Sequence, residues 1–209
     1  MRRPGLERLF VWAGFAALLA LAPGLFGSPL ALTLLSQIGI AAIACLSFTI
    51  PLGQGGMLSF GHAVYTGLGA YAAMHALNAI SNASTALPVS LVPLVGGVGG
   101  MACAALLGWL NTRRSGTSFA MISLGLGELV AAAAPMFPGF FGGEGGIAGN
   151  RAAGLPSGGI SFGPQLEVYG LVALYTFGCT TAMYAFTRTP LGRLLNAVRD
   201  NPERVDFIG

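Results

Sequence analysis

Residues 88–110 have the sequence PVSLVPLVGGVGGMACAALLGWL, without one charged side chain. A helix that crosses the hydrocarbon of a bilayer needs about 20 mostly apolar residues, and this stretch is long enough. Five further runs are similarly apolar, at residues 9–27, 30–51, 61–80, 117–141 and 167–187. We therefore expect a single all-α domain over residues 1–209, a polytopic transmembrane helical bundle of about six spanning helices.

The composition of the whole chain also indicates a lipid environment. Of the 209 residues, 54% are hydrophobic and only 8% are charged, whereas soluble domains carry about 25% charged residues. The net charge is +3, but the basic residues are all arginines at the ends of apolar runs, so we expect no nucleic-acid partner. A chain without lysine has no Walker A motif. We therefore expect no enzymatic activity, and ATP, if it drives this protein, would be hydrolysed by a separate chain.

The three cysteines, Cys45, Cys103 and Cys179, each lie inside an apolar run and far apart in sequence. Their spacing fits neither a metal site nor a disulfide framework, so we interpret them as small packing residues. The sequence predicts no metal ion and no cofactor.

The positions of the arginines predict the orientation of the chain. With six spans, the two ends and the turns 52–60 and 111–116 lie on one side, and of the ten arginines only Arg151 lies on the other side. Arginine and lysine concentrate on the cytoplasmic side, so we expect cytoplasmic N- and C-termini. The run 9–27 resembles a signal peptide, but Pro23 would follow the cleavage site, which favours a retained helix.

Two further segments have a predicted structural role. Gly96, Gly100, Ala104 and Gly108 recur at every fourth position, which places small residues on one helix face for close helix packing. Residues 142–166 are rich in glycine and too polar to span, so we expect an external loop whose role the sequence does not indicate.

The junction between the second and third runs, residues 51–62, reads PLGQGGMLSFGH. Its glycines interrupt the apolar pattern without adding charge. Non-helical backbone near a membrane is buried in protein or faces water, and broken helices form solute sites in transporters. Gln54, Ser59 and His62 are therefore predicted to lie along a substrate pathway. The alternative is a simple cytoplasmic turn.

Glu128 lies inside the fifth apolar run, within GLGEL. A carboxylate inside a membrane is costly, and its presence indicates a functional role. We therefore predict that Glu128 also lines the pathway, with His62 and His75 as possible partners. A hydrogen bond between helices or a position near the end of the helix would also explain it. A proton relay is disfavoured, because the spans offer no chain of ionisable groups.

The tail that follows the sixth run predicts a short amphipathic helix. Thr189 is a good N-cap and Pro190 suits the first turn. The spacing of Leu191, Leu194, Leu195 and Val198 makes one apolar face, and Asn201-Pro202 ends the helix. Such a helix either lies flat on lipid or docks in a groove of a partner protein.

Three stretches together resemble the LivM-type permease of bacterial branched-chain amino acid ABC importers. They are GQGGMLSFGHA at 53–63 with GLGAY at 67–71, SFAMISL at 118–124 running to Glu128, and RTPLGR at 188–193 with AVRDN at 197–201. The resemblance covers residues 30–209. The family's external loop often begins Thr-Gly-Gly, whereas Phe141 precedes Gly142-Gly143 here.

The resemblance implies a function and partners that the composition does not. It implies an inner-membrane permease that moves branched-chain amino acids by alternating access, with a LivH-type second permease, two cytoplasmic ATPase subunits and a periplasmic solute-binding protein. Segment 188–209 then resembles the cytoplasmic coupling segment, and the residues implied in ATPase coupling are Arg188, Pro190, Leu191, Gly192, Arg193, Leu194, Ala197 and Arg199.

Two alternatives remain open at this point. The substrate could be urea or a short amide, as in a sister group, or the chain could be a secondary transporter, a channel or a structural membrane subunit. Because members of the family continue with further spans, we also expect this sequence to be incomplete at its C-terminus.

Overall fold

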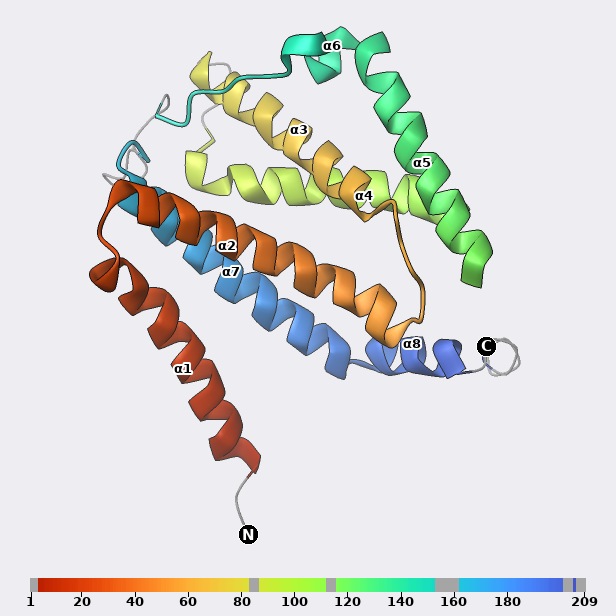
Figure 1. The fold of residues 1–209 in the computed structure, drawn as a ribbon, viewed down its shortest axis with the longest axis horizontal. Coiled ribbons are helices and arrows are strands. Elements are labelled where there is room, and N and C mark those ends of the chain that lie inside the picture. Colours follow the sequence, from red (N-terminus) through yellow and green to blue (C-terminus); the bar gives the residue numbers. More distant parts are fainter. Residues whose placement is uncertain (1–3, 83–86, 112–115, 153–161, 201–204, 206–209) are drawn as a thin grey trace. The chain divides into compact units, whose positions relative to one another are not determined.

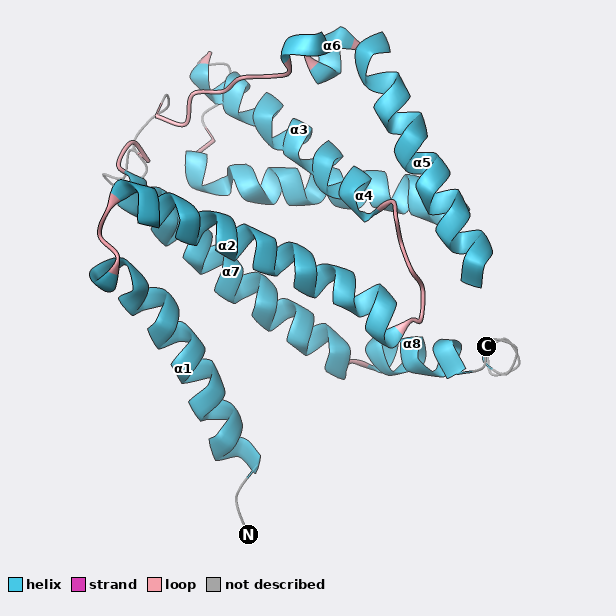
Figure 2. Ribbon diagram, in the orientation of Figure 1, coloured by secondary structure: helices cyan, strands magenta, loops and turns pink. Residues whose placement is uncertain are grey.

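A computed structural model describes residues 4–82, 87–111, 116–152, 162–200 and 205. Throughout these residues the regular structure is helical, without a strand (Figure 2). This confirms the predicted all-α class. The chain divides into two compact units, the first made of residues 1–46 and 162–185 and the second of residues 47–161 and 186–209.

Each predicted run forms a helix close to its expected bounds. These helices are α1 (Pro4–Leu25), α2 (Pro29–Thr49), α3 (His62–Ser81), α4 (Val92–Asn111), α5 (Gly116–Met136) and α7 (Gln165–Arg188). A single turn of 3-10 helix, η2 (Val89–Leu91), precedes α4, and the tail forms α8 (Pro190–Asp200) (Figure 1).

The expected bounds of the fifth run, 117–141, were wrong at the C-terminal end. Helix α5 stops at Met136, and the remaining residues form the separate short helix α6 (Pro138–Phe141). The residue before a proline is disfavoured in the α region, and Phe137 accordingly leaves it, with φ −119° and ψ 68°. A further 3-10 turn, η3 (Gly143–Gly145), follows α6.

Five helical segments in the described part of the chain are long and apolar enough to cross a membrane: 7–25, 29–54, 89–109, 116–136 and 165–188. Helix α3 is not among them, although its 20 residues would extend about 30 Å. Its two histidines, two tyrosines and Asn78 lower its average hydropathy. The sixth span, and the orientation that depends on it, therefore stay predictions. Arg2, Arg3, Arg113, Arg114 and Arg204 lie outside the described residues.

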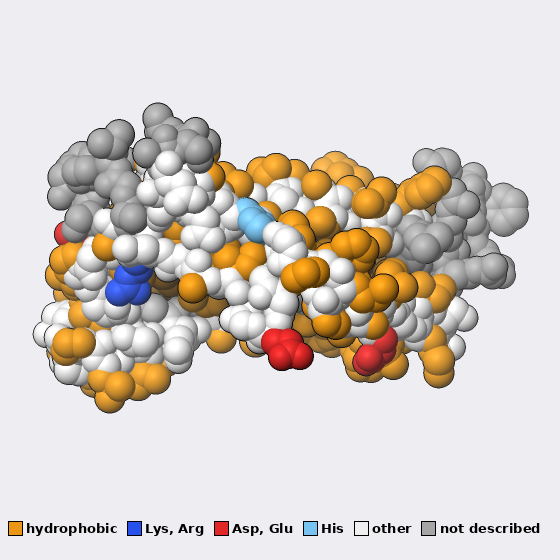
Figure 3. Space-filling model, turned by 90° about the horizontal axis from the view of Figure 1, so that it is seen from above, with side chains coloured by type: hydrophobic (Ala, Val, Ile, Leu, Met, Phe, Trp, Pro, Cys, Tyr) orange, Lys and Arg blue, Asp and Glu red, His pale blue; other side chains and the backbone are white. Residues whose placement is uncertain are grey.

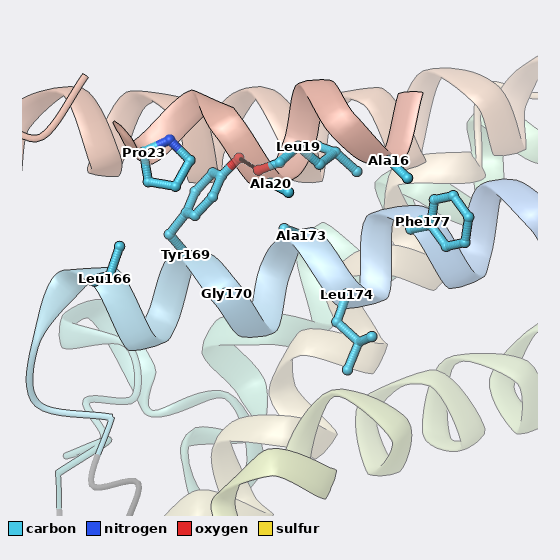
Figure 4. A pocket seen from close by; sticks show the side chains of 10 residues that line it. All are labelled: Ala16, Leu19, Ala20, Pro23, Leu166, Tyr169, Gly170, Ala173, Leu174 and Phe177. Carbon is cyan, nitrogen blue, oxygen red and sulfur yellow. Dashed lines mark hydrogen bonds between the residues drawn. The ribbon is translucent and has the colours of Figure 1, made fainter. Parts of the chain in front are cut away.

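In the first unit, α1 packs against α7. The Tyr169 hydroxyl donates a 2.8 Å hydrogen bond to the carbonyl oxygen of Leu19 (Figure 4). Farther along the two helices, Trp12 makes edge-to-face contacts with Phe177 and Tyr184, at centroid distances of 5.7 and 5.4 Å. Aromatic packing of this kind adds to the stability gained from burial alone, so it holds α1 on α7.

In the second unit, α3 and α4 lie side by side along a seam of small residues (Figure 1). A Cβ atom on Gly96 would lie 2.9 Å from both the Ala73 Cβ and the Gly69 carbonyl oxygen. A Cβ atom on Gly100 would lie 3.0 Å from the Tyr65 carbonyl oxygen. The predicted packing role of Gly96 and Gly100 is therefore confirmed, because only glycine permits so close an approach.

Much of the surface is apolar. On the face shown in the space-filling view, hydrophobic and uncharged groups cover most of the described surface, with isolated charged side chains between them (Figure 3). Large side chains such as Leu18, Leu106 and Leu174 are more than half exposed. Exposed apolar surface on this scale suits contact with lipid chains, as expected for a multi-pass membrane protein.

Candidate functional site

The junction begins with a widened helical turn. The last turn of α2 continues as a π-helix, η1 (Ile50–Gln54), with Pro51 near its start. Proline has no N–H to donate and its ring crowds the preceding turn, which accounts for the change of helix type here. The backbone N–H groups of Gly55 and Met57 both donate to the Pro51 carbonyl oxygen. Gly56, with φ +63°, then turns the chain out of the helix.

Helix α5 holds the second half of the junction in place. The Phe60 backbone N–H donates a 3.0 Å hydrogen bond to the Ser123 Oγ, which itself donates to the Ala120 carbonyl oxygen at 2.8 Å. Ser123 is fully buried. A Cβ atom on Gly61 would lie 2.9 Å from the Ser123 carbonyl oxygen. The second half of the junction is thus fixed to a neighbouring span at Phe60 and Gly61.

His62 lies at the start of α3 and contacts the end of α2. Its Nε2 forms a 2.8 Å hydrogen bond with the Ser47 Oγ, and its ring meets the Phe48 ring edge-to-face at 5.7 Å. His62 lines a cavity of about 500 Å³ between α3 and α4, together with Tyr65 and Thr66 and the small residues of the seam. This cavity offers hydroxyl and imidazole groups but, among the residues that line it, no carboxylate.

Glu128 lines a different cavity, of about 410 Å³, on the opposite face of α3 toward α5. The aromatic side chains of Phe60, Tyr71 and Phe141 line the same cavity. No described residue forms a hydrogen bond or ion pair with Glu128. The cavity therefore combines an available carboxylate with an apolar, aromatic wall.

The histidines are not partners of Glu128 in this structure. His62 bonds to Ser47, as described above, and the His75 Nε2 forms a 2.9 Å hydrogen bond with the carbonyl oxygen of Phe140. The His75 ring also lies 5.1 Å from that of Phe140. His75 thus fixes α6 on the C-terminal half of α3, and the structure does not bear out the proposed partnership.

Gln54 and Ser59 line neither of these two cavities. Ser59 is buried, at 7% exposure. The Oε1 of Gln54 is buried, and no described residue donates a hydrogen bond to it. The structure therefore separates the four predicted pathway residues: His62 and Glu128 reach cavities on opposite faces of α3, and the other two stay within the junction.

A third cavity, of about 420 Å³, lies in the first unit between α1 and α7 (Figure 4). Its lining is apolar except for Tyr169, whose hydroxyl already donates to the Leu19 carbonyl oxygen. A cavity without a convergent set of polar groups does not orient a polar solute, so it is not a candidate site.

Helix α8 begins as the sequence predicts. Thr189 caps it, because the Gly192 N–H donates a 3.3 Å hydrogen bond to the Thr189 Oγ1, and Pro190 occupies the first helical position. Gly192 is buried against the end of α7, where a Cβ atom would lie 2.8 Å from the Thr187 Cα. The expected helix-ending residues Asn201 and Pro202 lie outside the described part of the chain, and the described part of α8 reaches Asp200.

The two faces of α8 have different surroundings. Leu191 and Leu194 are exposed, at 65% and 49%, and so are Pro190, Arg193 and Ala197. Leu195 and Val198, which share the predicted apolar face, are half-buried. Of the residues implied in ATPase coupling, this leaves Leu191, Leu194 and their exposed neighbours available to a partner. Arg188, at the end of α7, is also exposed.

Arg199 contacts the junction, although its side chain stays 47% exposed. Its Nη1 donates a 2.8 Å hydrogen bond to the Gly53 carbonyl oxygen, and its Nε lies 3.3 Å from the Asp200 Oδ1. The resemblance implies ATPase coupling for both Arg193 and Arg199, but of these two only Arg199 makes this contact. The contact joins positions 146 residues apart, so no local pattern indicates it.

The sequence pattern did not indicate several residues that belong to the site. Ser47, which bonds to His62, carries no motif signal at all. Phe60 and Tyr71 stand in the motifs quoted above, but the motifs do not say that these rings line a cavity. Ser123 lies in the quoted stretch 118–124, which does not indicate a contact with the junction. Its hydroxyl is the hydrogen-bond acceptor that fixes the junction.

Gly149 and Asn150 of the predicted external loop also contact α3. A Cβ atom on Gly149 would lie 2.9 Å from the Leu77 Cδ2 and 3.1 Å from the Met74 Cε. The Ser81 Oγ lies 3.4 Å from the Asn150 carbonyl oxygen. This part of the loop therefore packs along the C-terminal end of α3.

One family model matches the chain over residues 30–209, and it describes the permease component of branched-chain amino acid transport systems. The match includes the junction, the Glu128 cavity and α8. No curated protein and no solved structure matches the chain.

Proposed function

Because the chain belongs to the family of permease components of branched-chain amino acid transport systems, we propose that it is a membrane subunit of an ATP-driven importer for these amino acids. In this proposal its ends face the cytoplasm of a bacterial cell and it crosses the inner membrane. Two ATPase subunits, a second permease and a periplasmic binding protein are its partners. The family match over residues 30–209 is the observation that carries the proposal.

The depth of Glu128 supports a place on the solute pathway. Glu128 lies twelve residues after Gly116, the first residue of α5, which is about 18 Å along a helix of about 31 Å. An ionised carboxylate near the middle of a span costs about 2.5–3.5 kcal/mol if it faces lipid. We therefore place the Glu128 face of α5 toward water or another protein chain.

The chemistry of the Glu128 cavity suits a branched-chain amino acid. Such a solute carries an ammonium group and an apolar side chain. The Glu128 carboxylate would attract the ammonium group, and the rings of Phe60, Tyr71 and Phe141 would contact the apolar side chain. Urea and simple amides carry no positive charge, so this carboxylate favours the amino acid over them.

The exposed part of α8 is the proposed docking site for an ATPase subunit. Leu191 and Leu194 are large apolar side chains that stay exposed on a helix outside the spans. Exposed apolar residues at helical spacing are a common anchor for a groove on a partner. In this proposal the ATPases move α8 as they bind and hydrolyse ATP, and the pathway opens alternately to the two sides.

The test is uptake by the reconstituted complex. The chain is co-expressed with its predicted partners, purified and placed in liposomes that contain ATP, and the accumulation of labelled leucine and labelled urea is measured. We expect leucine to accumulate only when ATP and the binding protein are present. Leucine uptake that persists without ATP would contradict an ATP-driven importer, and ATP-dependent uptake of urea alone would contradict the substrate assignment.

A further inference from the structure

Helix α8 and the junction are joined by one side chain, Arg199. Its guanidinium group donates a 2.8 Å hydrogen bond to the Gly53 carbonyl oxygen at the end of the π-helical turn. Carbonyl groups in the last turn of a helix lack donors within the helix. They also lie at the negative end of the helix dipole. A cationic donor at this position is therefore favourable on both counts.

The stem of the same side chain rests on Gly56. A Cβ atom on Gly56 would lie 2.6 Å from the Arg199 Cγ and 3.3 Å from its Cδ. Gly56 also has φ +63°, which side chains rarely adopt. Two separate constraints thus require glycine here, and the steric one exists only because Arg199 lies against this position.

Arg199 therefore holds the junction at two points, by its head on Gly53 and by its stem on Gly56. The other end of the junction is fixed to α5 by the hydrogen bond from Phe60 to Ser123. The residues between these two attachments lead into α3, whose two faces line the His62 and Glu128 cavities. A displacement of α8 would therefore be transmitted through Arg199 and the junction to the start of α3.

We propose that Arg199 is a positioning residue that transmits the movement of α8 to the junction backbone at residues 53–56, and that it is not an ATPase-docking residue. This inference rests on the proposed function, because it assumes that an ATPase moves α8. It separates two roles within one helix. The exposed leucines bind the partner, and Arg199 passes the movement on.

The experiment measures ATP hydrolysis and leucine uptake in the same reconstituted complex carrying Arg199→Met. We expect the ATPase to co-purify and to hydrolyse ATP within about twofold of the unmodified complex, while uptake per ATP falls at least tenfold. Arg199→Lys, which keeps a cation and a donor, should recover part of the loss. Asp200→Asn is the matched control, because it removes the exposed partner of Arg199 and leaves the Gly53 contact.

A second pair of variants tests the same contact from the junction. Gly56→Ala should displace the Arg199 stem and lower uptake per ATP, whereas Gly53→Ala has room, with its nearest neighbour at 3.6 Å, and should not. Monodisperse elution and ATPase co-purification show that each variant is folded.

Uptake per ATP that is unchanged in Arg199→Met would overturn the inference. Loss of ATPase binding in that variant would also overturn it, in favour of direct docking. If the proposed function itself is wrong, the unmodified complex will show no ATP-dependent uptake, which distinguishes that failure from a failure of the inference about Arg199.

Discussion

At the scale of single residues, Glu128 and Gln54 have the least ordinary surroundings. Glu128 is a carboxylate near the middle of an apolar helix, and no described residue pairs with it. The Oε1 of Gln54 is buried without a donor among the described residues. A buried acceptor without a donor costs stability, and so does a carboxylate that faces lipid near the middle of a span. Proteins retain such costs mainly at functional sites. Each therefore leads to a prediction that separates function from stability.

Glu128→Gln should lower leucine uptake at least tenfold while the complex still assembles. The amide has nearly the same shape but loses the charge that would attract the ammonium group of the solute, and tenfold corresponds to about 1.4 kcal/mol. Uptake by proteoliposomes at several leucine concentrations measures the effect. Glu144→Gln, on the exposed turn η3, is the control and should transport normally. Unchanged uptake in Glu128→Gln would make Glu128 a packing residue.

Gln54→Met should raise the stability of the purified chain by about 1 kcal/mol. Methionine has a similar length, and it removes a buried acceptor whose lost hydrogen bond with water costs about 1–3 kcal/mol. Thermal unfolding in detergent, followed by circular dichroism, gives the change. A clear loss of stability would mean that the Gln54 side chain makes a favourable interaction in the folded protein.

At the scale of elements, two helix contacts determine how the helices of the second unit pack together. The α3–α4 seam depends on small residues that let the two backbones meet, and α8 depends on a capped start and a glycine against the end of α7. The seam was predicted from residue spacing, because helical periodicity places residues four apart on one face, and the start of α8 was predicted from capping chemistry. The packing of Gly192 against α7 was not predicted. The direction in which each face points was not predicted, since it depends on the neighbouring helix.

Gly96→Ala and Gly97→Ala should have opposite effects on stability. A Cβ atom on Gly96 meets Ala73 and Gly69 at 2.9 Å, whereas one on Gly97 meets nothing within 4 Å. We expect the first variant to lose about 1–3 kcal/mol through overpacking. The second should gain up to about 1 kcal/mol, because alanine favours helix more than glycine. Thermal unfolding of the two variants in parallel measures both changes, and equal effects would argue against a tight seam.

Leu194→Asp should abolish co-purification of the ATPase and leave membrane insertion intact. Leu194 is half exposed on α8, so aspartate is tolerated by the chain itself but would bury an unpaired charge in an apolar groove of a partner. Affinity purification of the tagged chain, followed by blotting for the ATPase, provides the measurement. Co-purification at the normal level would indicate that α8 lies on lipid instead.

At the scale of the whole molecule, the described residues form a helical, multi-pass membrane protein. Five helical segments meet the length and hydropathy expected of a span, and α3 meets only the length. Whether α3 crosses the membrane decides whether the chain has an even or an odd number of spans. This in turn decides whether its two ends share a side.

We expect six spans, and labelling of single cysteines tests this number. In a variant without Cys45, Cys103 and Cys179, Arg8→Cys and Arg193→Cys should react with an impermeant thiol reagent only from the cytoplasmic side. Glu144→Cys should react only from the opposite side. All three replaced positions are exposed. Labelling of positions 8 and 193 from opposite sides would indicate an odd number of spans.

The sequence by itself determined the features that depend on local composition and spacing. The six helices, the N-cap of α8 and the small-residue seam follow from apolar length, capping chemistry and periodicity, all of which act over a few turns. Only the tertiary structure decided how distant segments meet. It placed Arg199 on Gly53, 146 residues away, anchored Phe60 on Ser123, and put His62 and Glu128 on opposite faces of α3. Such contacts depend on which helix faces pack together, and neither residue of a pair carries that information alone.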